Sequence, residues 1–111
     1  MHERRPGFDL EVSVVVHAVP TDGGGRRTPI ESGYRPLTTV EVQGHKTLIG
    51  LSELLLEAPI HPGSSGEGLL RFHRDVADLV RSLLRPGSEL SFAEGSHDVA
   101  SAKVIDIRQS P

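Results

Sequence analysis

Residues 23–36 read Gly-Gly-Gly-Arg-Arg-Thr-Pro-Ile-Glu-Ser-Gly-Tyr-Arg-Pro. Glycines open this segment, Arg26, Arg27 and Arg35 give it positive charge, and Tyr34 leads into the next apolar run. Glycine and proline fix turns rather than long helices or strands, so we expect a backbone-constrained connection. Guanidinium groups pair with carboxylates and phosphates, and the segment is therefore predicted to be a binding surface.

A strand is predicted just before this segment, because apolar and polar residues alternate over residues 8–19. The apolar positions are Phe8, Leu10, Val12, Val14, Val16 and Ala18. Period-two alternation rich in valine is typical of a half-buried strand. Further strands are predicted at residues 37–42, 46–49, 68–72, 89–93 and 99–107. Residues 51–56 are too few to distinguish a buried strand from a helical turn, so both remain open.

One helix is predicted at residues 74–85, where the apolar spacing changes to that of a helix. The apolar positions are Val76, Leu79, Val80, Leu83 and Leu84. Acidic residues near the start and arginines near the end suit the helix dipole, and Pro86 with Gly87 ends the pattern. We expect the apolar stripe to cover an open end or face of the strands; binding of a partner to this stripe is the alternative.

The composition indicates a single small domain that is mainly β. A chain of 111 residues can bury one core. The 12 glycines and 8 prolines favour short elements joined by many turns. We place the domain at residues 8–107 and expect flexible ends at 1–7 and 108–111.

The charge and the apolar content argue against several partners. The net charge of −3 lacks the basic field that DNA binding requires. No apolar run approaches the roughly 20 residues needed to span a bilayer, and residues 1–6 do not resemble a signal peptide. We therefore expect no membrane or DNA partner and a cytoplasmic location. The absence of cysteine excludes disulfides and thiol chemistry.

No motif predicts catalysis, a metal or a cofactor, so we do not expect an enzyme. Residues 44–47 lack the Gly-Lys-Ser/Thr order and the preceding glycine of a phosphate-binding loop. Asp75 and Asp78 have a sufficient role as acids near a helix start. The histidines His61, His73 and His97 are not spaced as zinc ligands.

Two separated segments resemble domain III, the C-terminal β-barrel domain of bacterial elongation factor Tu and related translational GTPases. Residues 24–29 and 33–36 are similar to the family's Gly-Gly-Arg-x-Thr-Pro and Gly-Tyr-Arg-Pro signature at the same internal spacing. Residues 90–95 and 99–104 resemble the last hairpin of that domain. The resemblance extends from about residue 8 to residue 107 and is weakest in the middle.

The resemblance implies an antiparallel Greek-key-like barrel of about six strands. The amphipathic helix predicted at about 74–85 lies where that family has a short strand connection, so we expect it to be an insertion. It implies a free-standing form of the domain, without the GTPase domain or the second barrel. In that family the domain is non-catalytic and engages macromolecules of translation, so we expect a protein partner. The implied contact residues are Arg26, Arg27, Tyr34, Arg35, Glu94 and Gly95.

An RNA or tRNA partner bound by the three arginines is the alternative. The last hairpin favours protein, because the family's tRNA-contacting arginine is Ala93 here and residues 96–98 are Ser-His-Asp in place of Gly-Arg-Thr. A purely structural role is also open for the loop. Arg35 would then bond loop carbonyls while the other two arginines are solvated. Tyr34 would be a lid on the core rather than a platform for base stacking.

Overall fold

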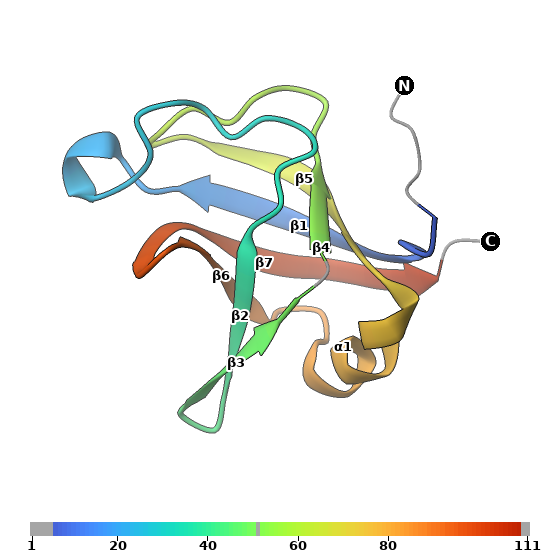
Figure 1. Ribbon diagram of the computed structural model, residues 1–111. Helices are drawn as coiled ribbons and strands as arrows, with labels where there is room; N and C mark the ends of the chain where they lie inside the picture. Colours follow the sequence, from blue (N-terminus) through green and yellow to red (C-terminus); the bar gives the residue numbers. More distant parts are fainter. Residues whose placement is uncertain (1–5, 51, 110–111) are drawn as a thin grey trace.

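The computed structural model describes residues 6–50 and 52–109, which fold around one antiparallel sheet (Figure 1). The strands are β1 (Leu10–Ala18), β2 (Leu37–Val42), β3 (His45–Ile49), β4 (Ser52–Leu55), β5 (Ser65–Phe72), β6 (Glu89–Glu94) and β7 (His97–Gln109). The helical elements are α1 (Ala77–Leu83) and two single 3₁₀ turns, η1 (Thr21–Gly23) and η2 (Arg74–Val76).

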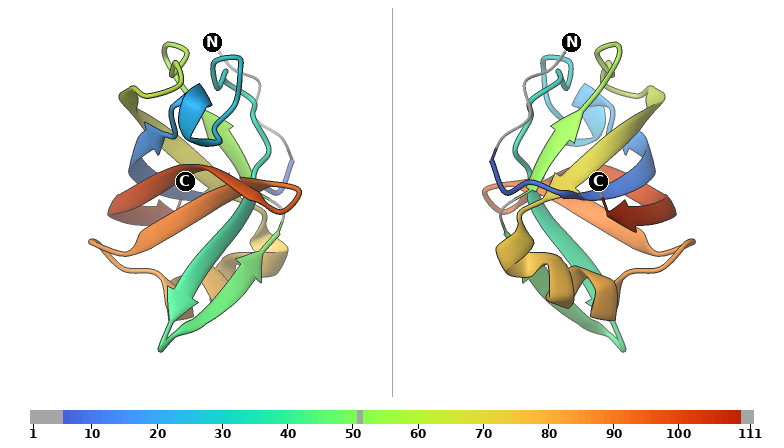
Figure 2. Two further views of the ribbon diagram at one scale, coloured as in Figure 1. Left: turned by 90° about the vertical axis from the view of Figure 1, so that its left-hand side faces the viewer. Right: turned by 90° about the vertical axis from the view of Figure 1, so that its right-hand side faces the viewer.

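The strands lie in the order β3-β2-β6-β7-β1-β5-β4, and Figure 2 shows the sheet curling around the core as a half-barrel. The prediction of a mainly β domain with one helix is confirmed. The predicted closed six-stranded barrel is wrong in detail. There are seven strands, and no ladder joins β3 to β4 among the described residues, so the two ends of the sheet remain edges.

The centre of the sheet is β1, which pairs with β5 on one side and β7 on the other. Its alternation is confirmed, because Val12, Val14 and Val16 are fully buried, whereas Ser13 and Val15 between them lie on the opposite face and are only partly buried. β-branched side chains suit this pleated, half-buried position. Phe72 and Phe92, from β5 and β6, supply the largest side chains of the same core.

The open question at residues 51–56 is answered by a strand, β4, which pairs with β5. Leu54 lies opposite Leu70, and both are fully buried. A hydrogen bond of 3.1 Å between the hydroxyls of Ser52 and Thr38 satisfies two buried polar groups. The extended conformation of β4 is therefore determined by pairing with a strand that is distant in sequence. Leu51 lies outside the described residues.

The predicted helix at 74–85 is shorter than expected. η2 occupies its first turn, capped by His73 Nδ1, which accepts a hydrogen bond from the backbone N–H of Asp75 at 3.1 Å. α1 ends at Leu83, because Leu84 becomes extended and enters the core ahead of Pro86. Val80 is also buried, and Val76 and Leu83 pack against the core, so this part of the stripe covers one end of the half-barrel as predicted. Leu79, also in the predicted stripe, is 41% exposed.

The final hairpin is longer than the two predicted strands. β6 reaches Glu94, and β7 continues to Gln109, two residues beyond the predicted end of the domain. β7 gains these residues because its last part pairs with the start of β1, where Leu10 lies opposite Gln109. The remaining residues of the predicted flexible ends, 1–5 and 110–111, lie outside the described residues.

Candidate functional site

The segment after β1 is folded tightly against the end of that strand. Gly25 donates its backbone N–H to Pro20 O at 3.0 Å, and the Thr21 hydroxyl donates to Arg26 O at 2.6 Å. A Cβ atom at Gly25 would lie 2.0 Å from Val19 O, so no other residue fits there without backbone movement. This close approach explains why a glycine precedes Arg26. It also fixes the position of the Arg26 backbone against the end of β1.

The second half of the segment covers the free side of β4. Gly33 N–H donates to Leu54 O and Leu54 N–H donates to Tyr34 O, each at 2.8 Å. The Ser32 hydroxyl accepts the backbone N–H of Leu56 at 2.9 Å. In Figure 1 this segment runs beside the loop between β4 and β5, and a β-bridge between Ile30 and Ile60 joins the two. Both ends of the segment are therefore anchored by backbone bonds.

Between these anchors, four side chains form what we call the Arg26 cluster: Arg26, Thr28, Tyr34 and Glu94. The Arg26 guanidinium pairs with Glu94 Oε2, donates to Thr28 Oγ1 at 3.1 Å, and lies 5.0 Å from the centre of the Tyr34 ring. The Tyr34 hydroxyl donates to the same Glu94 oxygen at 2.6 Å. The cluster thus links the segment to the turn of the β6–β7 hairpin.

The three ionisable groups of the cluster favour one protonation state. The Tyr34 hydrogen bond and the nearby Arg26 charge lower the pKa of Glu94, against a smaller opposing effect of burial. Burial and the bond to Glu94 raise the pKa of Tyr34. Burial alone would lower the pKa of Arg26, but the hydrogen bond and charge of Glu94 raise it. An arginine cation, a neutral phenol and a carboxylate therefore coexist over a wide pH range.

The other predicted contact residues face solvent. Arg27 and Arg35 are exposed, and neither forms an ion pair or side-chain hydrogen bond with the rest of the described chain. Gly95 lies in the exposed hairpin turn next to Glu94, with a positive φ of 62°. The purely structural alternative assigned these roles the other way round. In the structure, Arg26 bonds within the loop and Arg35 is solvated. Tyr34 is half-buried against the core, in agreement with a lid.

Sequence reasoning missed two polar contacts of interest. The first is Thr28, which completes the Arg26 cluster. The only feature of the sequence that pointed to this contact is its position two residues after an arginine in a turn-rich segment. His17 Nδ1 lies 2.5 Å from Ser65 Oγ across β1 and β5. No described carboxylate pairs with His17, so this pair lacks the third member of a nucleophilic triad.

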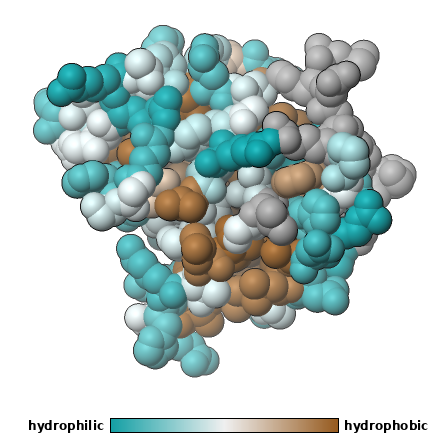
Figure 3. Space-filling model, in the orientation of Figure 1, coloured by the Kyte–Doolittle hydropathy of each residue, from teal (hydrophilic) through white to brown (hydrophobic). Residues whose placement is uncertain are grey.

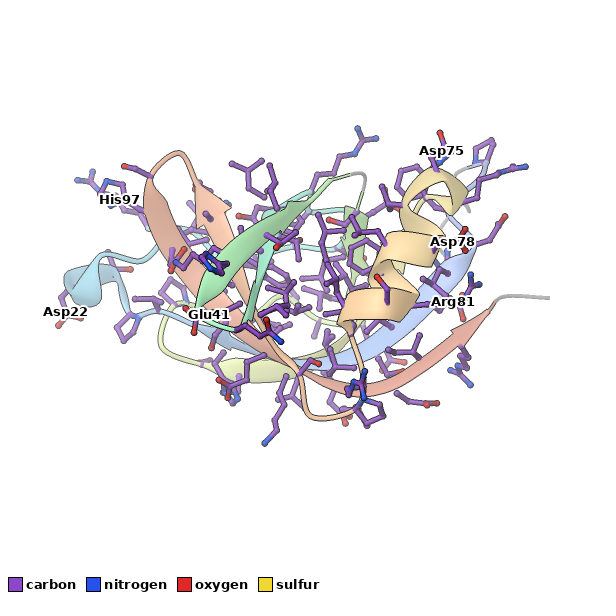
Figure 4. The ribbon with its side chains drawn as sticks, turned by 90° about the horizontal axis from the view of Figure 1, so that it is seen from below. Asp22, Glu41, Asp75, Asp78, Arg81 and His97 are labelled. Carbon is purple, nitrogen blue, oxygen red and sulfur yellow. The ribbon has the colours of Figure 1, made fainter. Side chains whose placement is uncertain are left out.

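The remaining titratable groups are dispersed. In Figure 4 Asp75, Asp78 and Arg81 follow the helical segment at one end of the molecule, and Asp22 and His97 lie at the other end. Within residues 6–50 and 52–109, no three His, Asp or Glu side chains are placed to hold a metal ion. No helix in this part of the chain is long and apolar enough to cross a bilayer.

An open groove of about 850 Å³ follows the outer face of β1 and β5. Its lining mixes acids with arginines, including Glu57, Glu67, Arg71 and Arg108. Arg71 is already paired with Glu11 at 3.1 Å. The groove is open, and the two acids and two arginines of its lining give it no net charge. The Arg26 cluster with its neighbours therefore remains the better candidate site.

The fold and this cluster define the chain as a β half-barrel domain with a pre-formed surface loop. No protein-family model matches the sequence, and the comparison with curated proteins found no match.

Proposed function

We propose that this chain is a non-catalytic binding domain, related to domain III of elongation factor Tu, that engages a protein partner through residues 22–36. The observation that carries the proposal is the Arg26 cluster. It holds the segment in one conformation while two neighbouring arginines, Arg27 and Arg35, stay exposed and unpaired among the described residues. Binding to a pre-ordered loop avoids the conformational entropy cost of ordering it on contact.

The charge distribution favours a protein over a nucleic acid. Two solvated guanidiniums, Arg27 and Arg35, lie in a segment that also carries Asp22 and Glu31, within a chain of net charge −3. Each guanidinium can pair with a carboxylate of a partner, and the acidic balance of the chain disfavours the many phosphate contacts that RNA binding uses. By its resemblance to a translation-factor domain, the partner is expected among proteins of the translation apparatus.

Affinity capture from native lysate tests the assigned surface. The tagged wild type is compared with the double variant Arg27→Ala/Arg35→Ala and with Arg74→Ala/Arg85→Ala, which removes the same charge from exposed positions near α1. We expect the main captured protein to be lost with the first variant and retained with the second. Equal capture by all three proteins would refute the surface. Capture dominated by RNA, lost in moderate salt, would favour the RNA alternative.

A further inference from the structure

His73 connects the end of β5 to the helical segment formed by η2 and α1, and its side chain caps that segment. Its Nδ1 atom accepts a hydrogen bond from the backbone N–H of Asp75 at 3.1 Å. Val76, which precedes α1, contributes no side-chain cap. Because an imidazole nitrogen accepts a hydrogen bond only when it carries no proton, this cap requires the neutral ring, with its proton on Nε2.

The segment before β1 holds the ring in this orientation. A Cβ atom at Gly7 would overlap Nε2, so the edge of the ring packs directly on the backbone of this glycine. The ring of Phe8 lies 5.2 Å from the imidazole in an edge-to-face arrangement. The backbone N–H of Arg74 donates to Gly7 O at 2.7 Å and ties the two segments together. Nδ1 is therefore kept directed at Asp75.

The same nitrogen also faces the side chain of Asp75. The carboxylate Oδ2 lies 3.4 Å from Nδ1 and pairs with the ring only when the ring is protonated. Asp75 thus offers a donor to the neutral ring and an acceptor to the protonated one. The two are unequal, because the Asp75 side chain is 71% exposed and water screens its ion pair. A cation at the start of a helical segment also opposes the helix dipole.

Several charged side chains lie on the elements around His73, but the ion pair of the ring is with Asp75. On β5, two residues before the ring, Arg71 pairs with Glu11 at 3.1 Å. The remaining charged groups on these elements are Asp9 before β1, Glu53 on β4, Arg74 on η2, and Asp78 of α1, which pairs with Arg81. Among the described residues, Asp75 is thus the carboxylate that takes up the protonated ring.

The helical segment that His73 caps covers the apolar end of the half-barrel. Ala77 and Val80 of α1 are buried in the core. Figure 3 shows apolar side chains gathered where β2 and β3 approach α1. In Figure 4 Asp75 lies at the start of this segment. A change at the cap therefore acts on an element that closes the core.

We propose that His73 is a proton-operated cap of the helical segment. The neutral ring holds the N–H of Asp75 and fixes the first turn. One proton from solvent, taken up at Nδ1, releases this N–H, pairs the ring with the Asp75 carboxylate and loosens the start of the segment. The loosening stays local, because Val80 and Leu84 remain buried. The cap is separate from residues 22–36, so the proposal does not depend on the function proposed above.

NMR of the isotope-labelled full chain tests the cap directly. The scalar coupling across the hydrogen bond, between the amide nitrogen of Asp75 and Nδ1 of His73, should be present at about pH 7.5 and absent at about pH 5, on either side of histidine titration. The amides of Val76 and Ala77 donate to His73 O and Arg74 O. Their protection, corrected for the intrinsic effect of pH on exchange, should fall about fivefold, as is typical of a lost side-chain cap. A coupling absent at the higher pH, or retained at the lower, would overturn the proposal.

Three variants separate this cap from the other histidines. His73→Asn keeps a neutral side-chain acceptor, so protection should change less than about twofold between the two pH values. His61→Asn, at an exposed loop position, removes an imidazole elsewhere and should retain the fivefold change. Asp75→Asn removes the carboxylate that takes up the protonated ring, so its loss of protection should exceed that of the wild type. Equal pH dependence in His73→Asn and the wild type would assign the change to another group and overturn the proposal.

Discussion

Tyr34 is a natural reporter of the Arg26 cluster, because the chain contains one tyrosine and no tryptophan. Burial and the bond to Glu94 raise its pKa, so the neutral phenol is stabilised in the folded state. The stabilisation linked to this proton is present below the ordinary tyrosine pKa of about 10 and is lost as the pH rises through the raised folded value.

Absorbance of tyrosinate against pH measures this shift directly. We expect the wild type to ionise at higher pH than the urea-unfolded chain. Glu94→Gln should lower the midpoint, because it removes the carboxylate charge, but the midpoint should stay above the unfolded value because burial remains. A folded wild type that titrates like the unfolded chain would show that Tyr34 does not bond Glu94 in solution.

Gly25 is the residue on which the position of Arg26 depends most. Gly25→Ala forces Cβ against Val19 O, and we expect it to lower the free energy of unfolding by at least about 2 kcal/mol. Gly23→Ala is the matched control, because a Cβ there meets only ordinary contacts at 3.7 Å and beyond. Urea unfolding of both variants checks this. Equal stability of the two would mean that the close approach at Gly25 relaxes without cost.

At the scale of elements, the two edges of the sheet should differ in hydrogen exchange. We expect the amide of Leu54 in β4 to be protected, because it donates to Tyr34 O. Along β3, Thr47 and Ile49 should exchange slowly and Lys46 and Leu48 fast, since only the former pair faces β2. Residue-resolved exchange by NMR measures the pattern. Uniform protection across β3 would contradict an open edge.

The same elements show how far the sequence alone reaches. β1 could be predicted because its alternating valines determine a strand locally. β4 could not, because its ladder with β5 and its cover by residues 30–34 are contacts between distant parts of the chain. The helix was predicted too long, because the periodicity continues through Leu84 although that residue leaves the helix for the core.

The candidate site was foreseen as a set of residues but not as a cluster. Arg26, Tyr34 and Glu94 entered the prediction through the resemblance. Their mutual bonding joins positions that are 60 and 68 residues apart, which no local pattern records. The exposed state of Arg35 likewise follows from the path of residues 30–36 over β4, and so could be read only from the fold.

At the scale of the whole molecule, the half-barrel separates two surfaces. In Figure 1 the segment between β1 and β2 crosses the top, and the open β3 edge lies toward the bottom beside α1. The first surface combines a fixed backbone with two solvated arginines; the second combines free backbone groups with exposed leucines.

The most direct test of the central claim is the dissociation constant of the captured partner, measured by calorimetry. The account predicts that Arg27→Ala/Arg35→Ala weakens binding at least about tenfold relative to the wild type, since each lost charge-assisted contact contributes on the order of 1 kcal/mol or more. It predicts that Arg74→Ala/Arg85→Ala, with the same net charge, stays within about twofold. Equal affinity of the two double variants would contradict the assignment of residues 22–36 as the binding surface.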